Sequence, residues 1–231
     1  MKISLRCDPA LSGVLPRPVP ARQVLPDWLR TMPMTARSDM HDADIRTVKQ
    51  CPPFVDAMRA GFSVLLPCDV TYADGLFAWD WPSPEPSLDG QPRAPINFFA
   101  AAQVAGAPFG ADNLIKFVGF WTIELPPGWS LLATHPFNRD DLPFRTLTGV
   151  VDADSFHQVA LLFPARWLDA GASCRLPRGT PIAQCVPVPR ASLDLEFGVI
   201  DGERADAFAT VGADILAGPG VYRERFRARD R

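Results

Sequence analysis

The segment TGVVDADSFHQVALLF, residues 148–163, places two carboxylates in a turn ahead of an apolar run. A carboxylate can act as a general base when burial raises its pKa toward neutral pH. Aspartate is also a common turn residue, because its side chain hydrogen-bonds to the backbone two residues further on. We expect Asp152 to face inward as a catalytic general base, and Asp154 to bond backbone amides of the turn.

Two histidines lie near this segment in the sequence. His135 and Asn138 belong to the loop THPFN, where a histidine before proline is held in an extended conformation. We expect His135 to be catalytic and Asn138 and His157 to bind substrate, although a purely structural loop is the alternative. His135, His157 and Asp152 could also hold iron or zinc, but no HxxxH or HxD spacing supports such a site. No cofactor is assigned, and a divalent metal stays open.

The segment VKQCPPFVDAMRAG supplies further candidates. The ammonium group of Lys49 would lower the pKa of the Cys51 thiol, which makes this pair a catalytic candidate with Cys51 as nucleophile or soft ligand. Free cysteines are more often small buried hydrophobic residues. Asp56, on a short helix, is expected to bind substrate, with helix capping or pairing with Arg59 as the alternative. Gln184, in GTPIAQC, completes the expected substrate-binding set.

The composition excludes several classes of function. The 231 residues carry a formal charge of −3, with 23 basic and 26 acidic residues and no basic stripe, so no nucleic-acid partner is expected. No apolar stretch has the roughly 20 residues that cross a bilayer, and no signal peptide is recognisable, so no membrane partner is expected either. Five cysteines without framework spacing argue against a disulfide scaffold. We therefore expect a cytoplasmic protein with a small-molecule ligand.

Proline is the outlying residue type, with 25 in all, roughly twice the usual frequency. Prolines are excluded from helix interiors and central strands, so a proline-rich apolar chain indicates β structure with many loops. We expect a short helix in PFVDAMRAG, strands over residues 115–124 and 129–134, and a fully buried strand in VALLF. A strand pair should surround residues 177–179. DLEFGVI reads as a strand, and a helix follows it.

The order of these segments resembles that of trimeric dUTPases and dCTP deaminases. AGFSVLLPCDV, GFWTIELPPGWSLLATHPFN, GVVDADSFHQVALLF and LPRGTPIAQCVPVPR follow one another as the AGYDL, PxGxxG, GVIDxDYxG and GDRIAQL segments of those enzymes do. The resemblance covers roughly residues 57–190 and implies a β-clip-like barrel. In it, Asp152 matches the carboxylate that activates water.

The sequence departs from that pattern at positions where the family has its phosphate-binding and base-stacking residues. Ser63 stands where the first motif has aspartate, and the P-R-S-G loop that holds phosphates is replaced by residues 135–138. Ser155 stands where the family has its base-stacking tyrosine, and His157 replaces a glycine. These differences argue against a typical dUTPase activity.

A second resemblance covers nearly the full length. VKQCPPFVDAMRAGFSVLLPCDV, FWTIELPPGWSLLATHPFN, VVDAD and GTPIAQ look like segments of an uncharacterised family of bacterial and phage proteins, recognised by a K-x-C-P-P-F-x-D-A segment. This resemblance implies no activity. GxGxxG, P-loop, GxSxG and CxxC patterns are all missing from the sequence.

Together these observations predict a mainly β chain: a single distorted dUTPase-like β-barrel at 51–200, a proline-rich N-terminal arm at 1–50 and a short helical tail at 201–231. We expect a small-molecule-binding enzyme of unknown substrate, with a place in specialised metabolism and with its site formed by the acidic turn and the His/Asn loop. The alternative is a non-catalytic assembly or interaction protein, such as a phage-like scaffold. A homodimer or homotrimer is expected.

Overall fold

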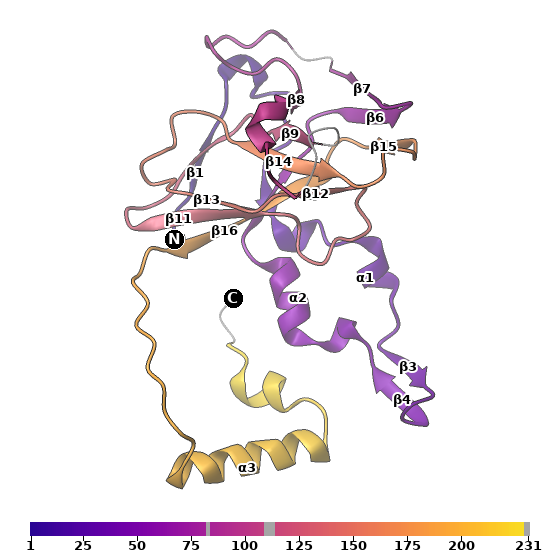
Figure 1. Cartoon of the computed structure of the whole chain (residues 1–231), viewed down its shortest axis with the longest axis vertical. Coiled ribbons are helices and arrows are strands. Elements are labelled where there is room, and N and C mark those ends of the chain that lie inside the picture. Colours follow the sequence, from indigo (N-terminus) through magenta and orange to yellow (C-terminus); the bar gives the residue numbers. More distant parts are fainter. Residues whose placement is uncertain (82–83, 109–113, 229–231) are drawn as a thin grey trace. The chain divides into compact units, whose positions relative to one another are not determined.

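The computed structural model describes residues 1–81, 84–108 and 114–228 (Figure 1). Contacts between Cα atoms divide the chain into two units. The first comprises residues 1–31 and 57–190, and the second comprises residues 32–56 and 191–231. Each unit is described by itself.

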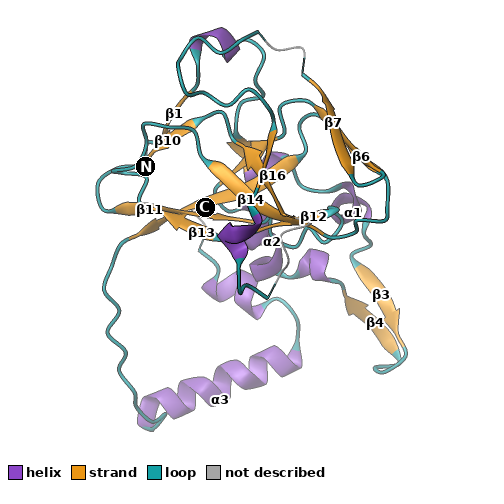
Figure 2. Ribbon diagram, turned by 45° about the horizontal axis from the view of Figure 1, so that its top comes forward, coloured by secondary structure: helices purple, strands orange, loops and turns teal. Residues whose placement is uncertain are grey.

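The secondary structure is mainly β, as expected from the composition (Figure 2). The strands of the first unit are β1 (Ser4–Arg6), β2 (Val19–Pro20), β5 (Phe62–Leu65), β6 (Asp69–Ala73), β7 (Leu76–Asp80), β8 (Ile96–Phe98), β9 (Leu114–Val118), β10 (Thr122–Glu124), β11 (Trp129–Thr134), β12 (Phe144–Thr146), β13 (Gly149–Val151), β14 (Leu162–Trp167), β15 (Cys174–Leu176) and β16 (Pro181–Pro189). The second unit holds the hairpin β3 (Thr35–Ser38) and β4 (Ala43–Arg46).

Helices are few and mostly short. They are α1 (Asp27–Thr31), α2 (Pro52–Arg59), α3 (Gly202–Ala217), the 3-10 helices η1 (Pro9–Leu11), η2 (Ala21–Gln23), η3 (Val48–Gln50) and η4 (Ala101–Val104), and the π-helix η6 (Tyr222–Phe226). None of the helices in the described part of the chain combines the length and the apolar character that a bilayer crossing needs.

The described strands form five separate antiparallel sheets. Their orders are β13-β11-β16-β5-β2, β12-β14-β9-β8, β15-β6-β7, β1-β10 and β3-β4. Across the described residues no sheet closes on itself, so no closed barrel is found. The five-stranded and four-stranded sheets instead share one cluster of buried apolar residues, which includes Leu131 and Ile182 from the first and Phe117 and Phe144 from the second.

The α2–β5 junction illustrates why the chain folds as it does here. Pro52 and Pro53 begin α2, where their missing N–H groups cost nothing, and Gly61 follows its end in the left-handed region, with φ +65°. A Cβ atom on Gly61 would lie 2.0 Å from the carbonyl oxygen of Cys185 on β16. Glycine is therefore required both for the turn and for the close approach of that turn to β16.

Several expected strands differ from the observed ones. The strand expected over 115–124 is interrupted between β9 and β10, where Phe120 adopts φ +56°. VALLF is not a fully buried strand, because β14 begins only at Leu162, and Val159 is exposed. Two strands do flank residues 177–179, but they do not pair with each other: β15 pairs with β6, and β16 pairs with β11 and β5.

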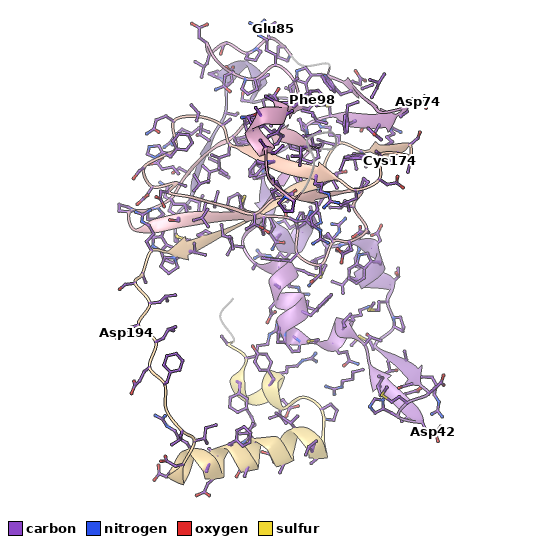
Figure 3. All side chains as sticks on the ribbon, in the orientation of Figure 1. Asp42, Asp74, Glu85, Phe98, Cys174 and Asp194 are labelled. Atoms are coloured by element: carbon purple, nitrogen blue, oxygen red, sulfur yellow. The ribbon has the colours of Figure 1, made fainter. Side chains whose placement is uncertain are left out.

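The second unit has an open structure. DLEFGVI is not a strand, because residues 191–200 have no regular secondary structure and are all exposed; Figure 3 labels Asp194 on this segment. The helix expected after it is present as α3. In the described part of this unit no residue is buried, so its elements have no core of their own.

Candidate functional site

The acidic turn is held by a single arginine. Arg190, after β16, forms an ion pair with both carboxylates, and Asp154 also accepts a hydrogen bond from the backbone N–H of Gly128, at 2.9 Å. The guanidinium of Arg190 and the Gly128 amide hold the pKa of Asp154 well below its usual range. The expected bond of Asp154 to a backbone amide is thus found, although the amide belongs to the β10–β11 turn.

Asp152 does not face inward, contrary to the expectation for a general base. Its side chain is 64% exposed and pairs with Arg190 at 3.3 Å, and the Ser130 hydroxyl donates a hydrogen bond to it, at 2.6 Å. A carboxylate that serves as a general base is normally buried in its site, and this one is open to solvent. Its surroundings are those of a surface ion pair.

His135 is buried, and both of its ring nitrogens are in use. Nδ1 accepts a hydrogen bond from the backbone N–H of Thr146, at 3.2 Å, and Nε2 lies 3.0 Å from the carbonyl oxygen of Arg139. This pattern fits a neutral ring with the proton on Nε2. Burial lowers the pKa of His135, and the ring packs edge-on against Phe144. Its hydrogen bonds join β11 to β12, which is a structural role.

The strand register keeps Asp152 and His135 apart. Asp152 meets Ser130 near the start of β11, whereas His135 follows the last residue of that strand. Five residues of extended chain separate Ser130 from His135, or roughly 17 Å at about 3.3 Å per residue. The two expected catalytic groups therefore lie at opposite ends of one strand and cannot act on one reacting atom.

Gln184, expected to bind substrate, is buried and bonded on all sides. Its Oε1 accepts from the backbone N–H of Phe137, at 2.9 Å, and its Nε2 donates to the carbonyl groups of Ala57 and Ala60. The hollow beside Gln184 and Phe137 measures only about 10 Å³, the size of a single water site. Asn138 is exposed in this loop with φ +57°. The loop after β11 thus offers no room for a substrate beside Gln184.

Three other expected site residues belong to the second unit. The Lys49 ammonium donates to the carbonyl group of Met32, at 2.9 Å. Cys51 is exposed, so it is not the buried hydrophobic residue of the alternative interpretation. The carboxylate of Asp56 is bonded by both Nε and Nη2 of Arg227, so Arg227 is an ion-pair partner of Asp56.

His157 is half-buried, and its Nδ1 has no hydrogen-bond partner in the described part of the chain. The metal site considered for His157 with His135 and Asp152 is not formed. Among residues 1–81, 84–108 and 114–228 no group of three or more histidine, cysteine or acidic side chains is placed to hold a metal ion.

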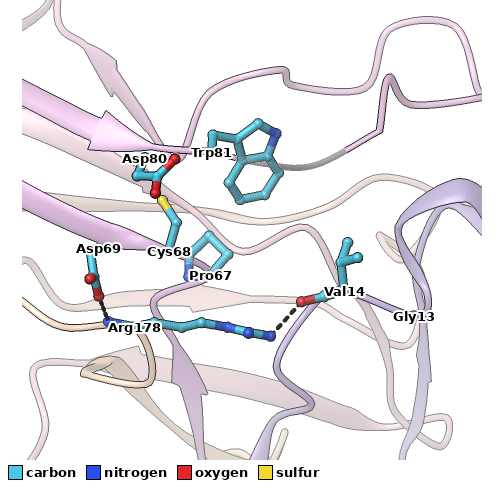
Figure 4. A pocket seen from close by; sticks show the side chains of 8 residues that line it. All are labelled: Gly13, Val14, Pro67, Cys68, Asp69, Asp80, Trp81 and Arg178. Atoms are coloured by element: carbon cyan, nitrogen blue, oxygen red, sulfur yellow. Dashed lines mark hydrogen bonds between the residues drawn. The ribbon is translucent and has the colours of Figure 1, made fainter.

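A different group of side chains surrounds a hollow of about 480 Å³ in the first unit (Figure 4). We call it the polar hollow. The loop after η1, the start of β6, the end of β7 and the turn before β16 line it, through Gly13, Val14, Pro67, Cys68, Asp69, Asp80, Trp81 and Arg178. In Figure 4 the side chain of Arg178 runs along one side toward Val14, and Asp80 and Trp81 lie on the other. Its volume is within the usual range for ligand sites, about 300–1,000 Å³.

The two carboxylates of the polar hollow differ in their engagement. Asp69 and Asp80 stand opposite each other in the β6–β7 register. Asp69 accepts from the backbone N–H of Arg178, at 2.7 Å, and pairs with Arg175, and these contacts lower its pKa. For Asp80, the described residues provide no hydrogen bond and no ion pair. Asp80 is therefore the carboxylate available to a ligand.

The polar hollow also contains a thiol and an indole. Burial, with Asp69 and Asp80 close by, raises the pKa of the Cys68 thiol to about 11, so the thiol stays protonated at neutral pH and is no nucleophile. Trp81 is stacked on Phe120, with ring centroids 5.0 Å apart, which fixes the indole as a flat wall. A carboxylate, an aromatic face and a guanidinium thus surround one space.

Sequence reasoning did not find this site, because its residues come from four distant segments. One signal was available: Asp74-Gly75 joins β6 to β7, both residues with positive φ, as in a two-residue hairpin turn. That turn places Asp69 opposite Asp80. Recognising it would have brought the two carboxylates together.

Comparison with known proteins gives distant structural likenesses. No protein-family model and no curated protein matches the chain. A dUTPase mutant from phage phi11 of S. aureus is similar in structure, with a TM-score of 0.40 and 12% identity over 86% of this chain and 97% of that one. A Staphylococcus bacteriophage 80alpha dUTPase mutant with dUpNHpp gives 0.40 and 12%, over 87% and 99%. Likenesses of this degree assign no activity to the chain.

Proposed function

We propose that the chain is a small-molecule-binding protein and that its ligand occupies the polar hollow. The observation that carries this proposal is the convergence of Asp80, Trp81 and Arg178 on one space of ligand size. Ligand sites typically combine such a cavity with a few polar groups that fix orientation. Catalysis is not part of the proposal, because no activated nucleophile lies among these groups.

The lining indicates the chemistry of the ligand. The indole of Trp81 offers a flat apolar face to a planar group. The carboxylate of Asp80 favours a positively charged group or hydrogen-bond donors next to that plane. The guanidinium of Arg178 already donates one N–H to the carbonyl oxygen of Val14 and has further N–H groups for an acceptor on the ligand. A planar polar molecule with donors at one edge and an acceptor at the other fits this set.

A thermal-shift screen with nucleotides, amino acids and planar amines tests the proposal. A ligand in excess over its Kd raises the unfolding midpoint by mass action. We expect at least one compound to raise it for the wild type, and Asp80→Asn and Arg178→Gln each to remove that shift. Both side chains are exposed, so neither change should alter the free energy of unfolding of the unliganded protein by more than about 0.5 kcal/mol.

Asp152→Asn is the matched control, because it removes an exposed carboxylate from the acidic turn and not from the polar hollow. The shift should survive in this variant. A shift that is lost in Asp152→Asn and kept in Asp80→Asn would place the ligand at the acidic turn and contradict the proposal. No shift with any compound would contradict the proposal and favour an assembly or interaction role.

A second candidate function is assembly or interaction, as in a phage-like scaffold. One observation favours it: the exposed segment 192–199 alternates polar and apolar residues, with Leu193, Leu195, Phe197 and Val199 all largely exposed. Strict alternation is the pattern of a strand with one buried face. Within the described part of the chain the segment has no strand partner, so another polypeptide is a natural candidate for covering it.

The finer assignment of the fold also remains a proposal. A distorted dUTPase-like β-clip is supported by the order of AGFSVLLPCDV, GVVDADSFHQVALLF and GTPIAQC along the chain. A cytoplasmic location and a homodimer or homotrimer are proposals of the same standing, drawn from composition and from that order.

A further inference from the structure

The charged side chains of the polar hollow determine which class of ligand it can hold. Asp69 and Asp80 are the acidic residues of its lining, and Arg178 is the basic one. The guanidinium of Arg178 donates to the carbonyl oxygen of Val14, and its backbone N–H donates to the carboxylate of Asp69. Within the described residues, Asp80 is the one of the three that has no hydrogen bond or ion pair. A ligand therefore meets one free negative charge there.

Three observations place the carboxylate of Asp80 at the polar hollow. Asp80 stands directly opposite Asp69 in the β6–β7 register, and the side chains of directly opposite residues lie on the same face of a sheet. On that face Asp69 reaches the backbone of Arg178. The charge of Asp80 also raises the pKa of the Cys68 thiol, which requires the two groups to lie close together. Figure 4 shows the Asp80 side chain beside that of Cys68.

The thiol of Cys68 also shows the sign of the electrostatic potential in the polar hollow. Burial has the largest effect on its pKa, which is raised to about 11. Among the charged neighbours, Asp69 and Asp80 each raise this pKa by more than Arg178 lowers it. Nearby charges that disfavour a thiolate produce a negative potential at its position. A cation therefore gains free energy from these charges, whereas an anion loses free energy.

Asp80 and Trp81 are neighbours in the lining and together define the shape of the ligand. The indole of Trp81 is held by its stack on Phe120, with ring centroids 5.0 Å apart. The two oxygens of a carboxylate accept two parallel N–H donors, as they do in arginine–carboxylate pairs. On the basis of the proposed function, we propose that the polar hollow selects planar aromatic cations of the amidine type, whose two N–H groups bond Asp80 and whose ring packs against Trp81.

Three probes of nearly equal size and shape test this proposal, with binding to the full chain measured by titration calorimetry. Benzamidine is an amidinium cation, benzamide is its uncharged counterpart, and benzoate is an anion. We expect benzamidine to bind about ten-fold tighter than benzamide, because hydrogen bonds between charged partners are about twice as strong as neutral ones. Benzoate should bind most weakly, since it enters a negative potential.

Asp80→Asn removes the charge at an exposed position, so it should weaken benzamidine binding about ten-fold and abolish its preference over benzamide. Asp74→Asn is the matched control, because Asp74 is an exposed carboxylate at the tip of the same hairpin and outside the lining. Asparagine also tolerates the φ of +51° at this position, so both affinities should stay unchanged.

NMR of the indole N–H groups reports independently where the probe binds. The signal of Trp81 is identified by its loss in Trp81→Phe. Benzamidine should shift this signal in the wild type and in Asp74→Asn, and the same concentration should shift it far less in Asp80→Asn.

Three outcomes would overturn the selectivity for cations. One is that benzamide or benzoate binds tightest; if Asp80→Asn and Arg178→Gln still remove that binding, the proposed function stands. Another is that wild type and Asp80→Asn bind benzamidine equally, which would place the cation outside the polar hollow. The last is that none of the three probes binds, and the proposed function then fails with it only if the thermal-shift screen also gives no shift.

Discussion

The buried ring of His135 makes the stability of the protein depend on pH. Burial lowers the pKa of His135 below its ordinary value of 6.5. As pH falls through about 6.5 the imidazole of His135 binds a proton in the unfolded chain, whereas in the folded chain it stays neutral to lower pH. This contribution to stability is therefore fully present above pH 7 and declines toward pH 5, by at most about 1.4 kcal/mol per pH unit.

Urea unfolding at several values between pH 5 and 8 measures this dependence. His135→Gln cannot titrate, so we expect its unfolding midpoint to be flatter with pH in this window. The acidic groups with lowered pKa values, such as Asp154, lose their contribution only in more acid solution and do not interfere. An equal slope in wild type and variant would show that His135 titrates normally.

The two aspartates of the acidic turn should respond differently to the same change. Asp154 is nearly buried and bonds Arg190 and the Gly128 amide, so Asp154→Asn should lower the unfolding midpoint at pH 7. The lowered pKa of Asp154 means that this contribution is present above about pH 4 and is lost as pH falls further. Asp152→Asn should leave the midpoint unchanged within error, because exposed ion pairs contribute little.

Thermal or urea unfolding of both variants at pH 7 and at pH 3 checks this pair. The difference between Asp154→Asn and wild type should shrink at pH 3. If Asp152→Asn were the destabilising change, the buried and exposed roles of the two carboxylates would have to be exchanged.

At the residue scale, the sequence indicated which side chains form hydrogen bonds but not whether they point into the core or toward solvent. The amide bond of Asp154 was predictable, because aspartate in a turn commonly bonds backbone N–H groups. The exposure of Asp152 and the burial of His135 depend on two strand registers, that of β11 with β13 and that of β12 with β14. No local pattern determines these registers. Local residue type therefore predicted bonding and failed on orientation.

At the element scale, Gln184 joins three parts of the first unit. It bonds the loop after β11 through Phe137 and the end of α2 through Ala57 and Ala60. Gln184→Leu keeps the approximate volume and leaves one N–H and two carbonyl groups without this partner. An unsatisfied buried group costs about 1–3 kcal/mol, so we expect a loss of stability of at least about 2 kcal/mol.

Urea unfolding measures that loss, with Gln23→Leu as the matched control because Gln23 is exposed on η2. The control should change stability by less than about 0.5 kcal/mol. A loss below 1 kcal/mol for Gln184→Leu would mean that water replaces the amide without cost, and Gln184 would then return as a binding candidate.

Elements with strong local signals were predicted well. The strand over 129–134 has the expected bounds, and the helix expected in PFVDAMRAG is found as Pro52–Arg59. The break at Phe120 could not be predicted, because a positive φ at a bulky residue is imposed by packing, and this ring stacks on Trp81. The pairing of β15 with β6 was also hidden, since sequence proximity had suggested β16.

At the scale of the whole molecule, the polar hollow could not be predicted because of where its walls come from in the sequence. Its walls come from residues near 13, 67, 80 and 178, which only long-range strand pairing brings together. Periodicity reports what a segment buries, and it does not report which distant segment it meets. A mainly β chain was therefore within reach of the sequence, whereas its ligand site was not.

The second unit makes the assembly of the chain testable. None of its described residues is buried. In its segment 192–199 the side chains of Leu193 and Phe197 are 87% and 90% exposed. Exposed apolar surface of this extent usually marks an interaction site. We therefore expect light scattering to give a mass of two or three times 25.3 kDa, and we expect Leu195→Asp with Phe197→Asp to lower it.

Leu88→Asp, at an exposed leucine of the first unit, is the matched control and should keep the wild-type mass. Chymotrypsin gives an independent measurement, because it cuts after exposed leucine and phenylalanine in extended chain. Covering of the segment by a second copy would slow cleavage at Leu193 and Phe197 as protein concentration rises. Cleavage that is fast at every concentration, together with a mass of 25.3 kDa, would contradict self-assembly and leave the segment to a partner of another kind.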